Sequence, residues 1–126
     1  MERHVTLLGV LTALWGWLGV VLGTSMLLLA VGALAEVMDP MRTSSEFLAV
    51  LTTAMLSVIG VFAILWGGAH LWSASLLRRR SPRGRVFSLA LAVVNLLVLP
   101  FGTFFGGYTM WVLLSESGRR LFEPPR

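Results

Sequence analysis

Two long apolar stretches dominate the first two thirds of the chain. The first runs from about residue 5 to 34 without an ionisable side chain, and the second, from about 47 to 77, contains one, His70. At a rise of about 1.5 Å per residue, about 30 residues form a helix of roughly 45 Å. That length exceeds the roughly 30 Å hydrocarbon core of a bilayer. Each stretch is therefore predicted to be a membrane-spanning helix.

The apolar pattern of the C-terminal third is interrupted once. Ser81-Pro82 is typical of a helix start, because the serine hydroxyl can accept a free backbone N–H and proline lacks that donor. Pro100, Gly102 and Thr103 then predict a hairpin turn, since proline disfavours helix at the preceding residue and threonine can cap a new helix. The two predicted helices cover residues 82–99 and 104–117.

Helix ends carry weaker signals. Thr43 and Glu46 have capping-box spacing ahead of the second apolar stretch, and Gly118 is placed to end the fourth helix. Ala33 and Ala35 resemble a signal-peptidase site, but the apolar run before them is about twice as long as a typical signal-peptide core. We therefore expect the first helix to be retained as a span.

Composition places this pattern among integral membrane proteins. The chain has 126 residues, of which 56% are hydrophobic and 13% charged, more apolar surface than a soluble domain of this size could bury. The predicted fold class is all-α, one transmembrane domain over residues 1–126 with two long helices and a shorter C-terminal hairpin forming a four-helix bundle. The formal net charge is +4, but the arginines flank apolar stretches, which argues against nucleic-acid binding.

The distribution of arginine predicts the orientation in the membrane. With four spans, the N-terminus, the segment 78–85 and the C-terminal tail share one side and hold nine of the ten arginines. Positive charge favours the cytoplasmic side, so both termini are expected there. The alternative is one kinked helix over residues 86–114, which would place the C-terminal tail on the opposite side.

The arginine segment has a second expected role. Arg83 and Arg85 fall in the first turn of a predicted helix, where the helix dipole disfavours cations. Nearby anions would offset this conflict, and anionic lipid headgroups are the expected source. The residues expected to bind headgroups, besides orienting the chain, are Arg78, Arg79, Arg80, Arg83 and Arg85.

Small and polar residues within the apolar stretches predict close helix packing. Glycine recurs at a seven-residue spacing in the first stretch and forms small-xxx-small pairs there and at the hairpin, a pattern typical of helix contacts in membranes. Asn95 is expected to form an interhelical hydrogen bond. Packing within the chain is favoured, and a dimer face is the alternative. The glycines concerned are Gly9, Gly16, Gly19, Gly23, Gly102 and Gly106.

Candidate chemistry is sparse. The chain has no cysteine, which excludes disulfides and thiolate ligands. His70 has no acidic or second histidine partner within the apolar stretches, so no catalytic residue, metal or cofactor is predicted. If the protein were an enzyme, His70, Asn95 and Tyr108 would be the residues with usable chemistry.

The C-terminal hairpin carries a resemblance. Its asparagine, its Pro-x-Gly-Thr turn and its Tyr-x-x-Trp-Val-Leu-Leu ending are Asn95, Pro100 to Thr103, and Tyr108 to Leu114. In these features residues 85–114, about a quarter of the chain, resemble a recurrent segment of small uncharacterised bacterial membrane proteins. The resemblance implies a multi-pass protein of the bacterial cytoplasmic membrane with four spans, and it implies no activity.

These observations predict a structural or accessory component of the membrane. A chain with no soluble domain leaves little surface except for lateral contact, so we expect a membrane protein partner or a homo-oligomer, in contact with anionic lipids. A small channel or transporter for an ion or neutral solute is the alternative, and a membrane-embedded enzyme is a third possibility.

Overall fold

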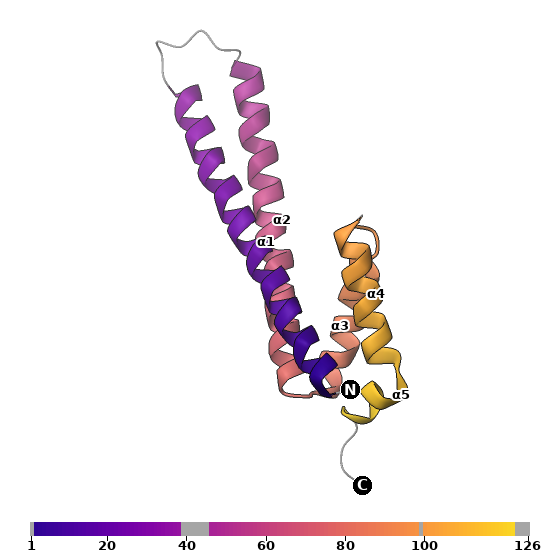
Figure 1. Ribbon diagram of the computed structural model, residues 1–126. Helices are drawn as coiled ribbons and strands as arrows, with labels where there is room; N and C mark the ends of the chain where they lie inside the picture. Colours follow the sequence, from indigo (N-terminus) through magenta and orange to yellow (C-terminus); the bar gives the residue numbers. More distant parts are fainter. Residues whose placement is uncertain (1, 39–45, 99, 123–126) are drawn as a thin grey trace. The chain divides into compact units, whose positions relative to one another are not determined.

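The computed structural model describes residues 2–38, 46–98 and 100–122, and within these it is helical with no strand (Figure 1). The all-α class predicted from the sequence is confirmed. The helices are α1 (Glu2–Val37), α2 (Glu46–Arg78), α3 (Pro82–Asn95), α4 (Phe101–Leu114) and α5 (Glu116–Arg120). Two of them, α1 and α2, are long and apolar enough to cross a membrane. Thr43, the predicted cap of α2, lies outside the described residues.

Contacts divide the chain into two units. We call Gly16–Gly68 the long-helix unit, and Met1–Trp15 together with Ala69–Arg126 the hairpin unit. Each unit has its own kind of helix contact, and they are described separately below.

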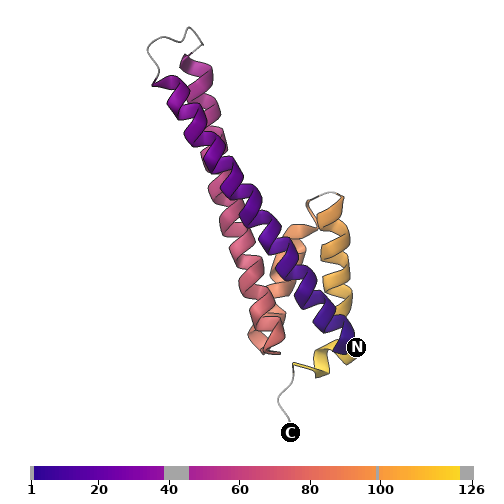
Figure 2. The same ribbon diagram turned by 60° about the vertical axis from the view of Figure 1, so that its left-hand side comes forward.

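In the long-helix unit, α1 and α2 lie side by side and antiparallel (Figures 1 and 2). Glycines of the two helices face each other in two places. A Cβ atom added at Gly67 would lie 2.5 Å from the carbonyl oxygen of Gly16, and one added at Gly23 would lie 2.6 Å from that of Gly60. Only glycine allows backbones to approach so closely, so these residues determine which face of α1 packs on α2.

In the hairpin unit, α3 and α4 lie side by side as an antiparallel pair (Figure 2). A Cβ added at Gly102 would lie 2.5 Å from the carbonyl oxygen of Asn95, and one at Gly106 would lie 2.6 Å from that of Ala92. The alternative of one kinked helix over residues 86–114 is therefore not what the chain forms. The unit has an apolar core made of Val5, Leu8, Leu77, Val112, Leu113 and Phe122.

The turn of the hairpin begins earlier than predicted. The predicted helix to residue 99 ends at Asn95, because proline cannot supply the N–H that the Leu96 carbonyl would need in a continuing helix. The Thr103 hydroxyl donates to that carbonyl instead, at 3.0 Å. Thr103 is therefore not the cap of α4, which begins at Phe101 with Pro100 at the N-cap position.

The predicted start of α3 is confirmed without its side-chain cap, and the predicted end of α4 is wrong. Pro82 is the first residue of α3, but the Ser81 side chain makes no capping hydrogen bond. Gly118 does not end α4. It lies inside the short helix α5, where its N–H donates to the Ser115 hydroxyl at 3.2 Å, and an added Cβ would collide with the Val112 carbonyl oxygen. The pattern of apolar residues gave no signal for α5, which has only five residues.

Candidate functional site

Two polar pairs are buried between α2 and α3 in the hairpin unit. Asn95 Nδ2 and His70 Nε2 are hydrogen-bonded at 2.9 Å. The hydroxyls of Ser73 and Ser88 lie 2.6 Å apart. All four side chains are buried. Since buried polar groups are stable only when hydrogen-bonded, the pairs tie α3 to α2. The interhelical hydrogen bond expected of Asn95 is formed.

The surroundings of the His70–Asn95 pair are aromatic. The Phe105 ring has its centroid 6.4 Å from that of His70, and it stacks on Trp15 at 6.0 Å. Asn95 Oδ1 is buried and has no hydrogen-bond partner among the described residues. The pair therefore keeps one acceptor atom free inside an apolar setting.

The residues that an enzyme would use are not brought together. His70 and Asn95 pair with each other, whereas the Tyr108 hydroxyl lies 3.2 Å from His4 Nδ1. The His4 ring in turn packs edge-on against Trp111 at 5.7 Å. Within residues 2–38, 46–98 and 100–122, no group of three or more His, Asp or Glu side chains could hold a metal ion.

The turn between α2 and α3 follows a known helix-ending pattern. The N–H of Arg80 donates to the Leu77 carbonyl at 3.0 Å, and that of Ser81 donates to the Leu76 carbonyl at 3.2 Å. This pair of bonds defines a Schellman motif, whose turn residue has a positive φ and is usually glycine. Here that residue is Arg80, with φ of 50°.

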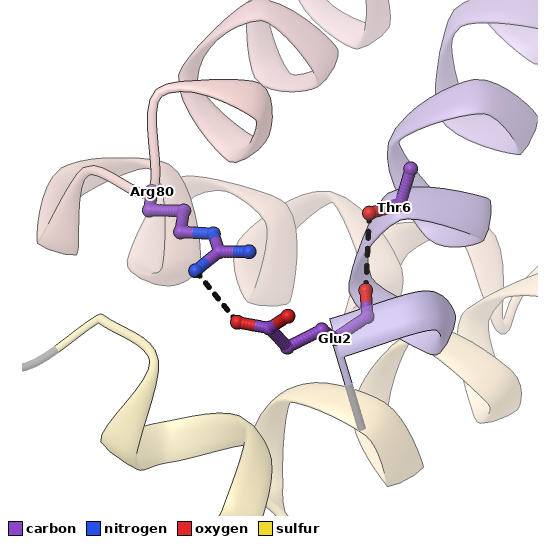
Figure 3. A network of polar contacts seen from close by, with 3 residues as sticks. All are labelled: Glu2, Thr6 and Arg80. Carbon is purple, nitrogen blue, oxygen red and sulfur yellow. Dashed lines mark hydrogen bonds and ion pairs between the residues drawn. The ribbon is translucent and has the colours of Figure 1, made fainter.

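The side chain of Arg80 gives a reason for arginine at a glycine position. Its Nη1 lies 3.0 Å from Oε1 of Glu2, in the first turn of α1 (Figure 3). One turn further along α1, the Thr6 hydroxyl donates to the backbone carbonyl of Glu2 at 3.0 Å (Figure 3). The ion pair therefore joins the start of α1 to the end of α2 within the hairpin unit.

The five arginines proposed for headgroup binding have different surroundings. Arg85 is partly buried, and its Nε donates to the Leu113 carbonyl at 2.9 Å, which satisfies a carbonyl at the C-terminal end of α4. Arg78 packs its side chain over Gly9, where an added Cβ would lie at an ordinary distance of 3.8 Å from Cγ. Arg79 and Arg83 are exposed. Two of the five, Arg80 and Arg85, thus have partners within the chain.

A groove of about 650 Å³ lies beside Arg83. It is formed by the last turns of α2 and the first turns of α3, and apart from Arg83 its lining is apolar. The lining side chains include Trp72, Leu76, Val86, Phe87 and Ala90.

No family model, curated protein or solved structure matches the chain. The resemblance of residues 85–114 to bacterial hairpin segments therefore stays an expectation. Any function has to be inferred from the chain's own residues and their contacts.

Some contacts could have been found from the sequence and were missed. Gly60 and Gly67 are seven residues apart, as are Gly16 and Gly23, and the equal spacing would have paired the two long helices in antiparallel register. Gly19 also faces α2, since an added Cβ would lie 3.1 Å from the Gly67 Cα. The Ser73–Ser88 pair had no comparable signal, because isolated serines are common in apolar helices.

Proposed function

We propose that the chain is an integral protein of a bacterial cytoplasmic membrane that acts as a structural or accessory component. In this proposal α1 and α2 each cross the bilayer, and α3 and α4 form a hairpin embedded from the cytoplasmic side. Both termini are then cytoplasmic, as the arginine distribution favours. No catalytic chemistry is assigned to the chain.

The observation that carries the proposal is the exposure of apolar side chains on the long helices. Only 11% of the most apolar window of α1 is buried within the chain, and only 6% of that of α2. A core helix of a soluble protein would be mostly covered by the rest of its fold. Contiguous apolar surface of this extent has to be covered by lipid or by another membrane protein.

The hairpin supports membrane embedding in a different way. Each arm has 14 residues, about 21 Å of helix, which is less than the roughly 30 Å hydrocarbon thickness. Its tip is nonetheless apolar and exposed, with Leu97 at 81% and Phe104 at 78%. The carbonyls of Asn95, Leu96 and Val98 accept hydrogen bonds within the turn. Internal hydrogen bonds to these carbonyls reduce the penalty that otherwise excludes turns from hydrocarbon.

The depth of this tip can be measured, because the chain has no cysteine. A Leu97→Cys variant in intact cells and in opened vesicles should stay unlabelled by a water-soluble maleimide from either side. A Ser117→Cys variant, near the proposed cytoplasmic face, should react in opened vesicles only. Labelling of Cys at position 97 from outside would show that the tip reaches the outer surface, as in four complete spans.

The accessory role is supported by the helix faces that are not used for packing within the chain. The packed faces of Gly23, Gly67, Gly102 and Gly106 are used within the chain, so a partner has to contact other faces. The remaining faces are apolar, and they are best suited to lateral contact with the helices of a membrane partner. The dimer contact through these glycine faces, weighed from the sequence, would require the intramolecular contacts to open.

Purification in mild detergent tests the accessory role. We expect a stoichiometric membrane partner or a homo-oligomer to stay bound during size-exclusion chromatography. Cross-linking in native membranes should give the same complex. Gly107 is a suitable position at which to change an outer helix face without disturbing packing within the chain, because an added Cβ there meets nothing within 4 Å. Gly107→Leu should keep the fold and alter the lateral assembly if this face is used. A monomer that cross-links to nothing in its native membrane would contradict the accessory role.

One observation favours a transporter as the second candidate. The buried His70–Asn95 and Ser73–Ser88 pairs, with the free Asn95 Oδ1, are polar groups of the kind that line solute paths between helices. Purified protein in liposomes should then conduct ions or release a neutral solute, and Asn95→Leu should abolish that flux. Absence of flux with a stable partner complex would favour the accessory role.

A further inference from the structure

The groove beside Arg83 has the size and lining of a ligand site. Its volume of about 650 Å³ falls within the roughly 300–1,000 Å³ typical of small-molecule sites in proteins. The rings of Trp72 and Phe87 form part of its wall, with centroids 5.2 Å apart, and Trp72 is 61% exposed. Val86 and Ala90 continue the apolar surface along α3. Such a lining suits a hydrocarbon chain.

The positive charge of Arg83, at one end of the groove, has no counterion among the described residues. Arg83 has no ion pair or hydrogen bond with any described residue. No Asp or Glu occurs between residues 69 and 115. In the same unit Glu2 pairs with Arg80, and Glu116 pairs with Arg120 at 2.6 Å. An anion beside Arg83 therefore has to come from outside the described chain.

Two arginines close to Arg83 in the sequence have partners for their guanidinium groups among the described residues. Arg80 is held by Glu2, and Arg85 is held by the Leu113 carbonyl. Arg83 alone among the five lines the groove. Of the five arginines expected to bind headgroups, Arg83 is therefore the one that has an apolar groove beside it.

The Trp72 indole adds a donor at the same place. Its N–H has no hydrogen-bond partner among the described residues, and tryptophan at a membrane surface places its ring in the apolar zone and its N–H toward polar lipid groups. The groove therefore offers hydrocarbon contact, one cation and one neutral donor. A second protein helix would fill the apolar part but would need its own carboxylate to match Arg83.

We propose that this groove binds one anionic glycerophospholipid. Its acyl chain lies against Trp72, Val86 and Phe87, and its phosphate lies at the Arg83 guanidinium. The proposal rests on the membrane placement proposed above and adds the ligand. Arg78 and Arg79 contribute only to the general attraction of the surface for anionic lipid.

Native mass spectrometry of the delipidated full chain in detergent tests the site. Phosphatidylglycerol and phosphatidylcholine with the same acyl chains are added in equal amounts, and the bound lipid is counted. We expect about one phosphatidylglycerol per chain, preferred about five-fold, which corresponds to about 1 kcal/mol for one arginine near an anionic group. Arg83→Gln should remove most of that preference. Arg79→Gln, the matched charge control, should keep it.

A second variant tests the apolar part of the groove. Ala90→Trp should fill the channel and reduce retention of both lipids while Arg83 stays in place. Equal lipid retention by Arg83→Gln and Arg79→Gln, or unchanged retention by Ala90→Trp, would overturn the proposal. So would a covalent dimer formed by Val86→Cys in membranes, because it would place a second copy in the groove.

Alkaline extraction of the same membranes separates this proposal from the one it rests on. Protein that remains in the membrane pellet but shows no lipid preference refutes the lipid site alone. Protein released into the supernatant refutes the membrane placement and the lipid site with it. Sizing of each variant in detergent confirms that the compared proteins are folded.

Discussion

Both units of this chain hold their helices together by close glycine contacts, and the hairpin unit adds buried polar pairs. In the long-helix unit, the contacts are glycine to backbone, at Gly16 with Gly67 and at Gly23 with Gly60. In the hairpin unit, buried side-chain pairs such as His70 with Asn95 join the helices as well. In the membrane placement proposed above, lipid would offer no hydrophobic driving force between helices, and close backbone packing and buried hydrogen bonds would hold the helices together. The comparison predicts that the glycine contacts do not tolerate an added side-chain atom. It also predicts that the buried polar pairs do not tolerate the loss of one partner.

The largest expected effect is at Gly67, with its neighbour as control. Gly67→Ala places a Cβ 2.5 Å from the Gly16 carbonyl oxygen and should lower the free energy of unfolding by about 1–3 kcal/mol, as overpacking does. Gly68→Ala, where nothing lies within 4 Å, should raise it by up to about 1 kcal/mol through helix propensity. Unfolding titrations in mixed micelles measure both. Equal effects of the two variants would refute the close glycine contact.

The next effect is at the buried polar pair of the hairpin unit. Asn95→Leu should destabilise the protein by about 1–2 kcal/mol, because it removes a buried interhelical hydrogen bond. A double-mutant cycle with His70→Leu isolates the pair, and a coupling of about 1 kcal/mol is expected. A coupling indistinguishable from zero would mean that the two side chains act independently, contrary to their 2.9 Å contact.

A similar or smaller effect is expected where Arg85 meets the end of α4. Its Nε donates to the Leu113 carbonyl, and removal of one charged hydrogen bond to a partly buried acceptor should cost about 1 kcal/mol or somewhat more. Arg85→Gln should therefore destabilise the protein, whereas the exposed Arg79→Gln should not. If both variants unfold together with the wild type, Arg85 does not support α4.

The smallest effect concerns Arg80, where two contributions oppose each other. Arg80→Gln loses a solvent-exposed ion pair with Glu2 and should cost less than about 1 kcal/mol. Arg80→Gly loses the same pair but relieves the positive φ of 50°, a conformation that costs other residues about 1 kcal/mol or more. The glycine variant should therefore be at least as stable as the glutamine variant. The reverse order would show that the backbone at this turn is not strained.

The sequence was most informative where backbone chemistry leaves few choices. Pro82 at the start of α3 and the turn around Pro100 could be predicted because proline limits what the chain can do on either side of it. The end of α3 at Asn95 could not, since it depends on the Leu96 carbonyl finding the Thr103 hydroxyl after the chain has turned. A contact between residues of two helices carries no local signal.

The candidate site was predictable only in part, for a related reason. The need for a partner at Asn95 follows from burying an amide, but helices that are apolar all round do not show which face meets which neighbour. His70 as that partner, Ser73 with Ser88, and the groove beside Arg83 emerge only in three dimensions. The arginine segment was visible as a charge pattern, while the difference between Arg80, Arg83 and Arg85 was not.

The return of the chain to its starting side of the membrane is the claim on which the account depends most. Two reporters test it when each is fused after residue 126: a phosphatase active only in the periplasm and a fluorescent protein that fluoresces only in the cytoplasm. The same two fusions after residue 41 are the control, because that loop is expected on the periplasmic side. We predict fluorescence without phosphatase activity at residue 126, and the reverse at residue 41. Phosphatase activity at residue 126 would contradict the embedded hairpin and the cytoplasmic placement of the C-terminus.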